Sequence, residues 1–165
     1  MAKIDIVKAE KEEIKQLSIL ATSILRELYA PMLGKEQNDY ILNKYQTEKA
    51  FAEQFDRGYN YYWAKYEGKN VGMLGFYPIE NKMYLSKLYL DKQYRGKKIG
   101  RKLFDFLVNF TRDKGLKSIF LKVIKKNENT IKIYEHLGFV KIREERSNIG
   151  QGYFLDEFVY EYYLK

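Results

Sequence analysis

Residues 83–115 constrain the fold most, because they predict a strand, a short basic turn and a long helix in direct succession. Residues 83–90 are rich in β-forming side chains and lie between Asn81 and Asp91, a pattern typical of a strand. Beyond the turn, apolar side chains recur at the spacing of one helix face: Ile99, Leu103, Phe106, Leu107 and Phe110. Gly115 follows at a position where glycine commonly ends a helix.

The turn, residues 93–100, places backbone N–H groups at the N-terminus of the predicted helix. Positive side chains surround it: Arg95, Lys97, Lys98, Arg101 and Lys102. The N–H groups of a first helical turn have no partner within the helix, and the helix dipole favours an anion there. The turn therefore suits a phosphate-bearing ligand.

The amino-acid composition narrows the classes of fold and function that remain possible. The 165 residues, 45% of them hydrophobic, predict one domain over 1–165 with a substantial core. Without cysteine and with only His136, a disulfide framework, a thiolate or zinc site and a cysteine nucleophile are disfavoured, and we expect no metal. His136 precedes Gly138 near a predicted helix end, where we interpret it as structural. No apolar run reaches a membrane span and no signal-like segment opens the chain, which predicts a cytoplasmic protein without a membrane partner.

The net charge of +8 has several interpretations: nucleic acid, an anionic surface, a polyanionic small ligand, or a lysine-rich composition without a partner. An RNA-recognition sheet would carry a longer basic and aromatic string around a glycine. Gly138-Phe139-Val140 is only a fragment of such a string. We therefore predict no nucleic-acid partner.

The other elements follow from periodicity and turn residues. Pro31 and Gly34 are expected to end the first helix, and Thr47 is a plausible N-cap. The predicted strands are 3–7, 59–66, 71–77, 118–124, 139–146 and 153–163, with helices 10–28, one or two within 36–55, and 127–137, and hairpin turns at 67–70 and 78–82. Hairpin-linked strands and one strand–helix–strand crossover predict an α/β fold with a mixed, mostly antiparallel sheet and helices on both faces.

Neither the three-glycine dinucleotide fingerprint nor the phosphate loop ending in Gly-Lys-Ser/Thr occurs. The sequence instead contains Arg95-x-x-Lys98-x-Gly100 after the predicted strand, and Asn127-x-x-Thr130-x-x-x-Tyr134-Glu-x-x-Gly138-Phe139 downstream. Together these motifs closely resemble the GNAT superfamily of N-acetyltransferases, and the order of elements fits that fold throughout. Lys98 replaces the first glycine of the family's loop, so we expect a conformation open to a side chain there. Thr130 stands where alanine is usual.

The resemblance implies acetyl-CoA as the cofactor and assigns its binding residue by residue. Main-chain groups around Leu88, Tyr89 and Leu90 would pair with the pantetheine arm, where the strands near Leu88 and Leu121 would splay apart. The pyrophosphate would lie on the turn and helix start: Arg95, Gly96, Lys97, Lys98, Ile99, Gly100 and Arg101. Asn127 would bind the cofactor arm, cap the following helix, or do both.

Tyr134 is the catalytic residue that the resemblance implies, as proton donor to the departing CoA thiolate. Its alternative is a half-buried tyrosine that only packs. Many relatives place a glutamate base on the central strand, but Ser86 occupies that position here, with Lys87 beside it. Other carboxylates are substitutes for this base by residue type only, and each is also interpretable as an ordinary solvated group: Glu80, Glu128, Glu144, Asp156 and Glu157.

The acceptor is less constrained. Residues 147–161 resemble bacterial polyamine (PaiA-like) acetyltransferases, and carboxylates there would suit a cationic small-molecule amine. Protein N-termini, lysines and aminoglycosides remain alternatives, as does a non-catalytic CoA-binding sensor, given Ser86. A homodimer through tyrosines of the last strands is also left open.

Overall fold

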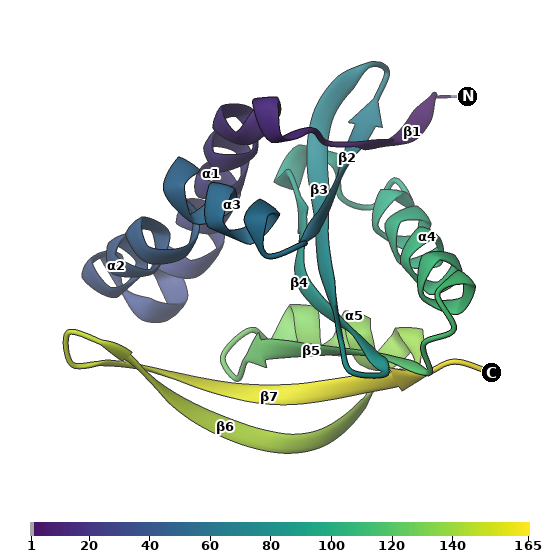
Figure 1. The fold of residues 1–165 in the computed structure, drawn as a ribbon. Coiled ribbons are helices and arrows are strands. Elements are labelled where there is room, and N and C mark those ends of the chain that lie inside the picture. Colours follow the sequence, from purple (N-terminus) through teal and green to yellow (C-terminus); the bar gives the residue numbers. More distant parts are fainter. Residues whose placement is uncertain (1) are drawn as a thin grey trace. The chain divides into compact units, whose positions relative to one another are not determined.

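The computed structural model describes residues 2–165, in which seven strands form one sheet in the order β1-β2-β3-β4-β5-β7-β6 (Figure 1). The strands are β1 Ile4–Lys8, β2 Asn60–Tyr66, β3 Lys69–Ile79, β4 Lys82–Leu90, β5 Ser118–Ile124, β6 Val140–Gly150 and β7 Tyr153–Tyr163. The helices are α1 Ile14–Leu33, α2 Lys35–Tyr45, α3 Glu48–Asp56, α4 Ile99–Asp113 and α5 Glu128–Leu137, with short 3-10 turns η1 Lys11–Glu13 and η2 Lys92–Tyr94. The predicted α/β class and the predicted order of elements are confirmed.

The chain divides into two compact units, and the points of division fall within β4 and within α4. Unit 1 runs up to Tyr77 and includes Lys87–Leu107, and unit 2 consists of Pro78–Ser86 and Val108–Lys165. A single functional domain over 1–165 remains a prediction. No helix within residues 2–165 is both long and apolar enough to cross a membrane.

In unit 1, helices cover both faces of the sheet because successive strand residues point to opposite sides. The Tyr61 ring lies 5.2 Å from Phe51 of α3, whereas the neighbouring Tyr62 ring lies 4.7 Å from Phe106 of α4. The core on the α1 and α3 face consists of Ala9, Leu17, Ala21, Phe51, Tyr61, Trp63 and Met73. Figure 1 shows α1 and α3 on one side of β2 and β3 and α4 on the other.

One predicted helix end is wrong, and the number of helices within residues 36–55 is now known. Helix α1 continues through Pro31 to Leu33, so the predicted end at Pro31 is wrong. Proline's fixed φ matches a helix, and near the C-terminus it removes only one backbone bond. Gly34 ends α1 at φ 83°, and its N–H donates to the Ala30 carbonyl at 2.9 Å. Residues 36–55 form two helices, and Thr47 caps the second by accepting from Ala50 N–H at 3.1 Å, as predicted.

The hairpin turns are tighter than predicted. Strand β3 begins at Lys69 and ends at Ile79, which leaves Glu67-Gly68 and Glu80-Asn81 as two-residue turns. Glu67 and Gly68 have φ of 50° and 80°, the paired left-handed geometry that matches strand twist. The predicted strand 139–146 likewise extends, as β6, to Gly150.

Unit 2 contains the predicted parallel crossover. Lys82, Met83 and Tyr84 of β4 pair in parallel with Ser118, Ile119 and Phe120 of β5. Strand β7 then pairs antiparallel with both β5 and β6, so the sheet is mixed and mostly antiparallel. Gly115 adopts φ 73° just beyond α4, which confirms the predicted helix end.

A buried carboxylate joins the strands of unit 2. Glu161 of β7 is 1% exposed, and it accepts hydrogen bonds from the Ser118 hydroxyl and from Lys82 Nζ, the latter at 3.1 Å. Burial tends to raise the pKa of Glu161, but the hydrogen bonds from Ser118 and Lys82 outweigh it and hold the pKa below its ordinary value. The ionised carboxylate therefore stabilises the fold.

Replacing Glu161 with Gln should lower the free energy of unfolding by about 2 kcal/mol near neutral pH, because a charged hydrogen-bond acceptor is lost. A depressed pKa contributes stability above the unfolded-state value of 4.5 and loses it as pH falls through the folded-state value. The deficit in thermal unfolding of Glu161→Gln should therefore be smaller at about pH 3 than near neutral pH. The exposed Glu53→Gln variant is the control, and an equal deficit at both pH values would contradict the assignment.

Candidate active site

The end of β4 is fixed by a close approach to β3. Asp91 N–H donates to the Val71 carbonyl at 2.8 Å. A Cβ at the next residue, Gly72, would lie 2.6 Å from the Tyr89 carbonyl oxygen, so only glycine fits without displacing a strand. Sequence reasoning missed Gly72, since a glycine within a strand does not by itself reveal what approaches it.

The turn after β4 has the geometry of an anion cradle. Gly96 has φ 78° and Lys98 has φ 66°, and Lys102 N–H donates to the Lys98 carbonyl at 3.1 Å. Helical bonding therefore starts at that carbonyl and leaves the first N–H groups of α4 without intrahelical partners. A Cβ built on Gly96 or Gly100 meets nothing within 4 Å, so the loop presents open backbone.

Several predicted basic side chains already have partners in unit 1. Arg95 Nη2 donates to the Leu90 carbonyl at 3.3 Å, and Lys97 Nζ lies 5.6 Å from the centre of the Tyr66 ring. Arg101 pairs with Asp105 at 3.1 Å. Lys98 and Lys102 are exposed. The backbone therefore supplies the fixed donors of this loop, and the side chains supply surrounding positive charge.

The downstream motif lies in unit 2. Asn127 is 3% exposed, and its Oδ1 accepts from Thr130 N–H at 3.4 Å, so the capping interpretation is confirmed. Tyr134 is half-buried on α5, with its ring edge toward Phe139 at a centroid distance of 5.3 Å. His136 is exposed in the last turn of α5, which Gly138 ends at φ 107°.

The carboxylates considered as bases differ in environment. Burial raises the pKa of Glu157, with a further upward contribution from Glu145 and a downward one from Lys122. Glu144 instead accepts from Lys125 at 2.8 Å, and that hydrogen bond lowers its pKa. Glu80 lies in a hairpin turn at φ 56°. No group of three or more His, Asp or Glu suited to a metal ion occurs among residues 2–165.

Sequence reasoning also passed over the burial of Lys87. Its side chain is 4% exposed in unit 1, and its Nζ lies 5.2 Å from the centre of the Phe51 ring. Burial lowers the pKa of Lys87 to about 7. A signal did exist, since Lys87 occupies the same strand face as the buried Met83 and Leu85.

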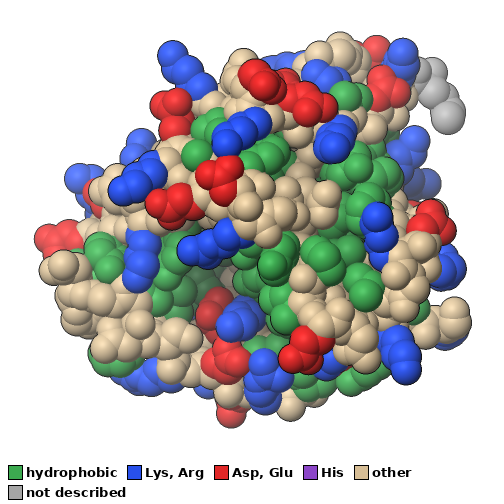
Figure 2. Space-filling view, in the orientation of Figure 1, with side chains coloured by type: hydrophobic (Ala, Val, Ile, Leu, Met, Phe, Trp, Pro, Cys, Tyr) green, Lys and Arg blue, Asp and Glu red, His purple; other side chains and the backbone are tan. Residues whose placement is uncertain are grey.

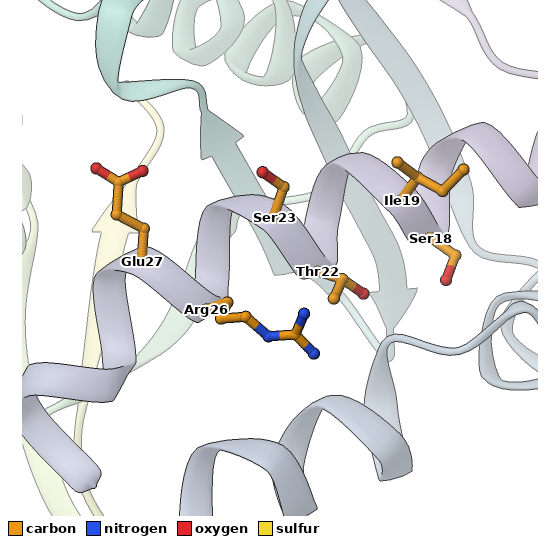
Figure 3. A pocket seen from close by; sticks show the side chains of 6 residues that line it. All are labelled: Ser18, Ile19, Thr22, Ser23, Arg26 and Glu27. Carbon is orange, nitrogen blue, oxygen red and sulfur yellow. The ribbon is translucent and has the colours of Figure 1, made fainter. Parts of the chain in front are cut away.

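Helix α1 carries an open cavity of about 540 Å³, lined by Ser18, Ile19, Thr22, Ser23, Arg26 and Glu27 (Figure 3). Glu27 also pairs with Lys92 of η2 at 3.5 Å. Over the face in Figure 2, Lys and Arg side chains are interspersed with Asp and Glu. The positive charge on that face is therefore scattered, in contrast to its concentration in the turn after β4.

The family model described as "Acetyltransferase (GNAT) family" matches residues 23–139, more than half of the chain. The chain belongs to the GNAT family. It is 33% identical over 123 residues to the uncharacterized N-acetyltransferase YjgM of Escherichia coli (strain K12), covering 72% of this chain and 74% of that protein. It is 32% identical over 83 residues to a probable spermine N(1)-acetyltransferase of Bacillus subtilis subsp. natto, covering 45% of this chain and 55% of that protein.

Solved GNAT structures share this fold, although their sequence identity to this chain is lower than that of the relatives above. The PaiA N-acetyltransferase of Thermoplasma acidophilum, solved in complex with coenzyme A, superposes with a TM-score of 0.80 and 22% identity. That alignment covers 96% of this chain and 98% of the other, so it shows the fold. The chain spans between 38% and 58% of the length of three vertebrate N-acetyltransferase relatives that it also matches.

Lys98 departs from the GNAT loop, and the structure corrects our expectation for it. Instead of a conformation open to side chains, Lys98 adopts φ 66°, in the left-handed region that favours glycine. The loop therefore keeps its geometry despite the lysine, at the cost of local backbone strain.

The strain at Lys98 predicts that Lys98→Gly is more stable than Lys98→Ala by about 1 kcal/mol, because both lose the charge but only glycine relieves the left-handed conformation. Chemical denaturation of the two variants measures this difference. Lys102, inside α4, is the matched control. There the alanine variant should be more stable than the glycine variant by about 1 kcal/mol. If the glycine and alanine variants rank in the same order of stability at both positions, Lys98 is not strained.

Proposed function

We propose that this chain is an acetyl-CoA-dependent N-acetyltransferase that moves an acetyl group to a primary amine by direct attack in a ternary complex. The observation that carries the proposal is the turn after β4, where left-handed Gly96 and Lys98 and the open Gly100 precede α4 in a GNAT chain. An anionic ligand gains backbone donors and the helix dipole there. The coenzyme A bound by the similar PaiA N-acetyltransferase has such a group in its pyrophosphate.

The residues fit this cofactor in unit 1. The N–H groups of Gly96, Lys97, Lys98, Gly100 and Arg101 would hold the pyrophosphate, and the buried Ile99 begins α4 among them. Arg95 and the exposed lysines would add positive charge without fixing a geometry. Because Gly100 has open space where a side chain would begin, backbone can approach a ligand closely.

Strand β4 would hold the pantetheine arm through main-chain groups of Leu88, Tyr89 and Leu90. The Leu90 carbonyl already accepts from Arg95, and its second lone pair stays available. In unit 2, the Asn127 Oδ1 is committed to capping α5, which leaves its side-chain NH₂ as the donor to the cofactor arm.

Acetyl-CoA supplies, when bound, an acetyl thioester that an amine can attack. The acceptor must first become neutral, because primary amines are mostly protonated near neutral pH. Tyr134 would then donate its phenolic proton to the leaving thiolate as general acid. Its half-buried ring, held against Phe139, suits a donor that must keep one orientation.

A polyamine is the acceptor class that we favour. A relative is named a probable spermine N(1)-acetyltransferase, and residues 147–161 contain carboxylates suited to cations. Among them, Glu157 is partly buried with a raised pKa, and Asp156 pairs with Arg146 at 3.8 Å. Glu157 is therefore the stronger candidate to meet an ammonium group.

Replacing Gly100 with Leu should weaken coenzyme A binding at least tenfold by calorimetry, since a side chain would enter the space that the pyrophosphate needs. Thermal unfolding without ligand should hardly change, because nothing in unit 1 lies within 4 Å of the added Cβ. Unchanged affinity would remove this loop from the binding site.

Turnover of acetyl-CoA, followed as free thiol, should depend on one amine class in a panel of polyamines, amino acids, aminoglycosides and short peptides. Tyr134→Phe should lower kcat about 100-fold while sparing coenzyme A affinity, since only the proton donor is removed. Tyr160→Phe is the control: it deletes a phenol that donates to Glu135 at 2.9 Å and should keep kcat. Tight coenzyme A binding without turnover for any amine would favour a sensor.

A further inference from the structure

We infer that Phe139 and Tyr162 are positioning residues for Tyr134, and that together they fix where its phenolic proton is presented. The inference rests on the proposed general-acid role of Tyr134 and deepens it. All three residues lie in unit 2, on α5, directly after it and on β7. A proton donor must stay within hydrogen-bond reach of the atom that it protonates, so a ring displaced by about 1 Å lowers the rate severely.

The first argument is the way in which α5 ends. Gly138 adopts φ 107°, and its N–H donates to the Glu135 carbonyl at 3.1 Å. The Phe139 N–H donates to the Tyr134 carbonyl at 3.0 Å. These two bonds form a Schellman motif, in which the residue after the left-handed glycine packs on the helix residue whose carbonyl it binds. The backbone that ends α5 therefore brings the Phe139 side chain to Tyr134.

The second argument is the packing of rings around this turn. Phe139 is 3% exposed, and the Tyr134 ring meets it edge to face with the ring centres 5.3 Å apart, a favourable geometry for an aromatic pair. The Tyr162 ring of β7 lies 5.4 Å from the Phe139 ring, and it would lie 3.3 Å from a Cβ built on Gly138. Tyr162 thus contacts both residues of the turn, so β7 limits the movement of Phe139 and, through it, of the Tyr134 ring.

Helix α4, which also ends in unit 2, provides a comparison. The Gly115 N–H donates to the Arg112 carbonyl at 2.9 Å. The Leu116 N–H donates to the Thr111 carbonyl at 3.1 Å, so α4 and α5 end with the same motif. A Cβ on Gly115 would meet nothing within 4 Å, whereas the corresponding Cβ at the end of α5 meets the Tyr162 ring. Ending a helix therefore does not require this packing, and it occurs at the helix that carries the proposed acid.

Replacing Gly138 with Ala should lower kcat about tenfold, because the added methyl group presses on the Tyr162 ring and displaces the turn. The assay uses acetyl-CoA and the best acceptor among spermine and the other amines of the panel. Gly115→Ala is the matched control, since it places alanine at the same left-handed position of the same motif in open space. Both variants should lose thermal stability, but only Gly138→Ala should lose turnover. Equal kcat in the two variants overturns the inference.

A double-mutant cycle separates positioning from general damage to the fold. Phe139→Leu alone should lower kcat about tenfold while sparing coenzyme A affinity, since the ring that holds Tyr134 is lost. In the Tyr134→Phe background the same change should alter kcat by about twofold at most, because residues that act as one unit are not additive. Phe110→Leu, on α4, is the control and should keep kcat in both backgrounds. A further tenfold loss from Phe139→Leu in the Tyr134→Phe background overturns the inference.

The position of the Tyr134 ring can also be measured without cofactor or acceptor. In protein with isotope-labelled tyrosine, the NMR signals of this ring are identified by their absence from Tyr134→Phe. Neighbouring aromatic rings shift these signals, so they should move toward their unfolded positions in Phe139→Leu and in Tyr162→Leu. They should stay in place in Tyr160→Phe, which changes the same face of β7 but keeps the ring contacts of the turn. Unmoved signals in Phe139→Leu and Tyr162→Leu overturn the positioning role.

Failure of the proposed function would give a different pattern of results. Wild type that binds coenzyme A but releases no thiol with any amine contradicts the acetyltransferase function, and the inference with it. Full kcat in Tyr134→Phe contradicts the general acid and therefore the positioning of its proton. A loss of kcat in Tyr134→Phe together with full kcat in Phe139→Leu contradicts this inference alone.

Discussion

The close approach of β3 to β4 at Gly72 is the constraint on which unit 1 depends. With no side chain at Gly72, the Tyr89 carbonyl lies within 2.6 Å of where a Cβ would stand, and the bond from Asp91 to Val71 fixes the strand end. That end aims the chain into η2 and the glycine turn, so α4 starts at a defined place. Two strands packed this tightly give the turn a rigid base, which a binding site made of backbone requires.

Unit 1 carries several features that oppose stability. Asn38 and Gln46 are buried, and the side-chain carbonyl oxygen of each accepts no hydrogen bond within residues 2–165. Lys87 adds a buried amine, and Lys98 adds a left-handed backbone. Departures of this kind from local rules are commonly found at functional sites, where their cost is offset elsewhere in the fold. The aromatic core of Phe51, Tyr61 and Trp63 is the natural source of that compensation.

Much of the fold was accessible from local pattern. The strand, turn and helix of residues 83–115, the Thr47 cap and the helix end at Gly115 rest on short-range geometry, and each is confirmed. The boundary at Pro31 was wrong because a proline in the last turn removes a single bond while its φ still suits a helix. Strand ends were misplaced because ladder pairing with a neighbour, which a single segment does not reveal, decides where β3 and β6 stop.

The sequence by itself determined the family, the order of elements and the glycine turn, because periodicity, capping and turn chemistry act over a few residues. Only the tertiary structure decided that Lys87 is buried, since the ring of Phe51, 36 positions earlier in the chain, removes its amine from water. It also decided that Lys98 takes a glycine conformation and that Gly72 faces a carbonyl. Charge burial and close approach are set by partners distant in sequence, and no local pattern specifies them.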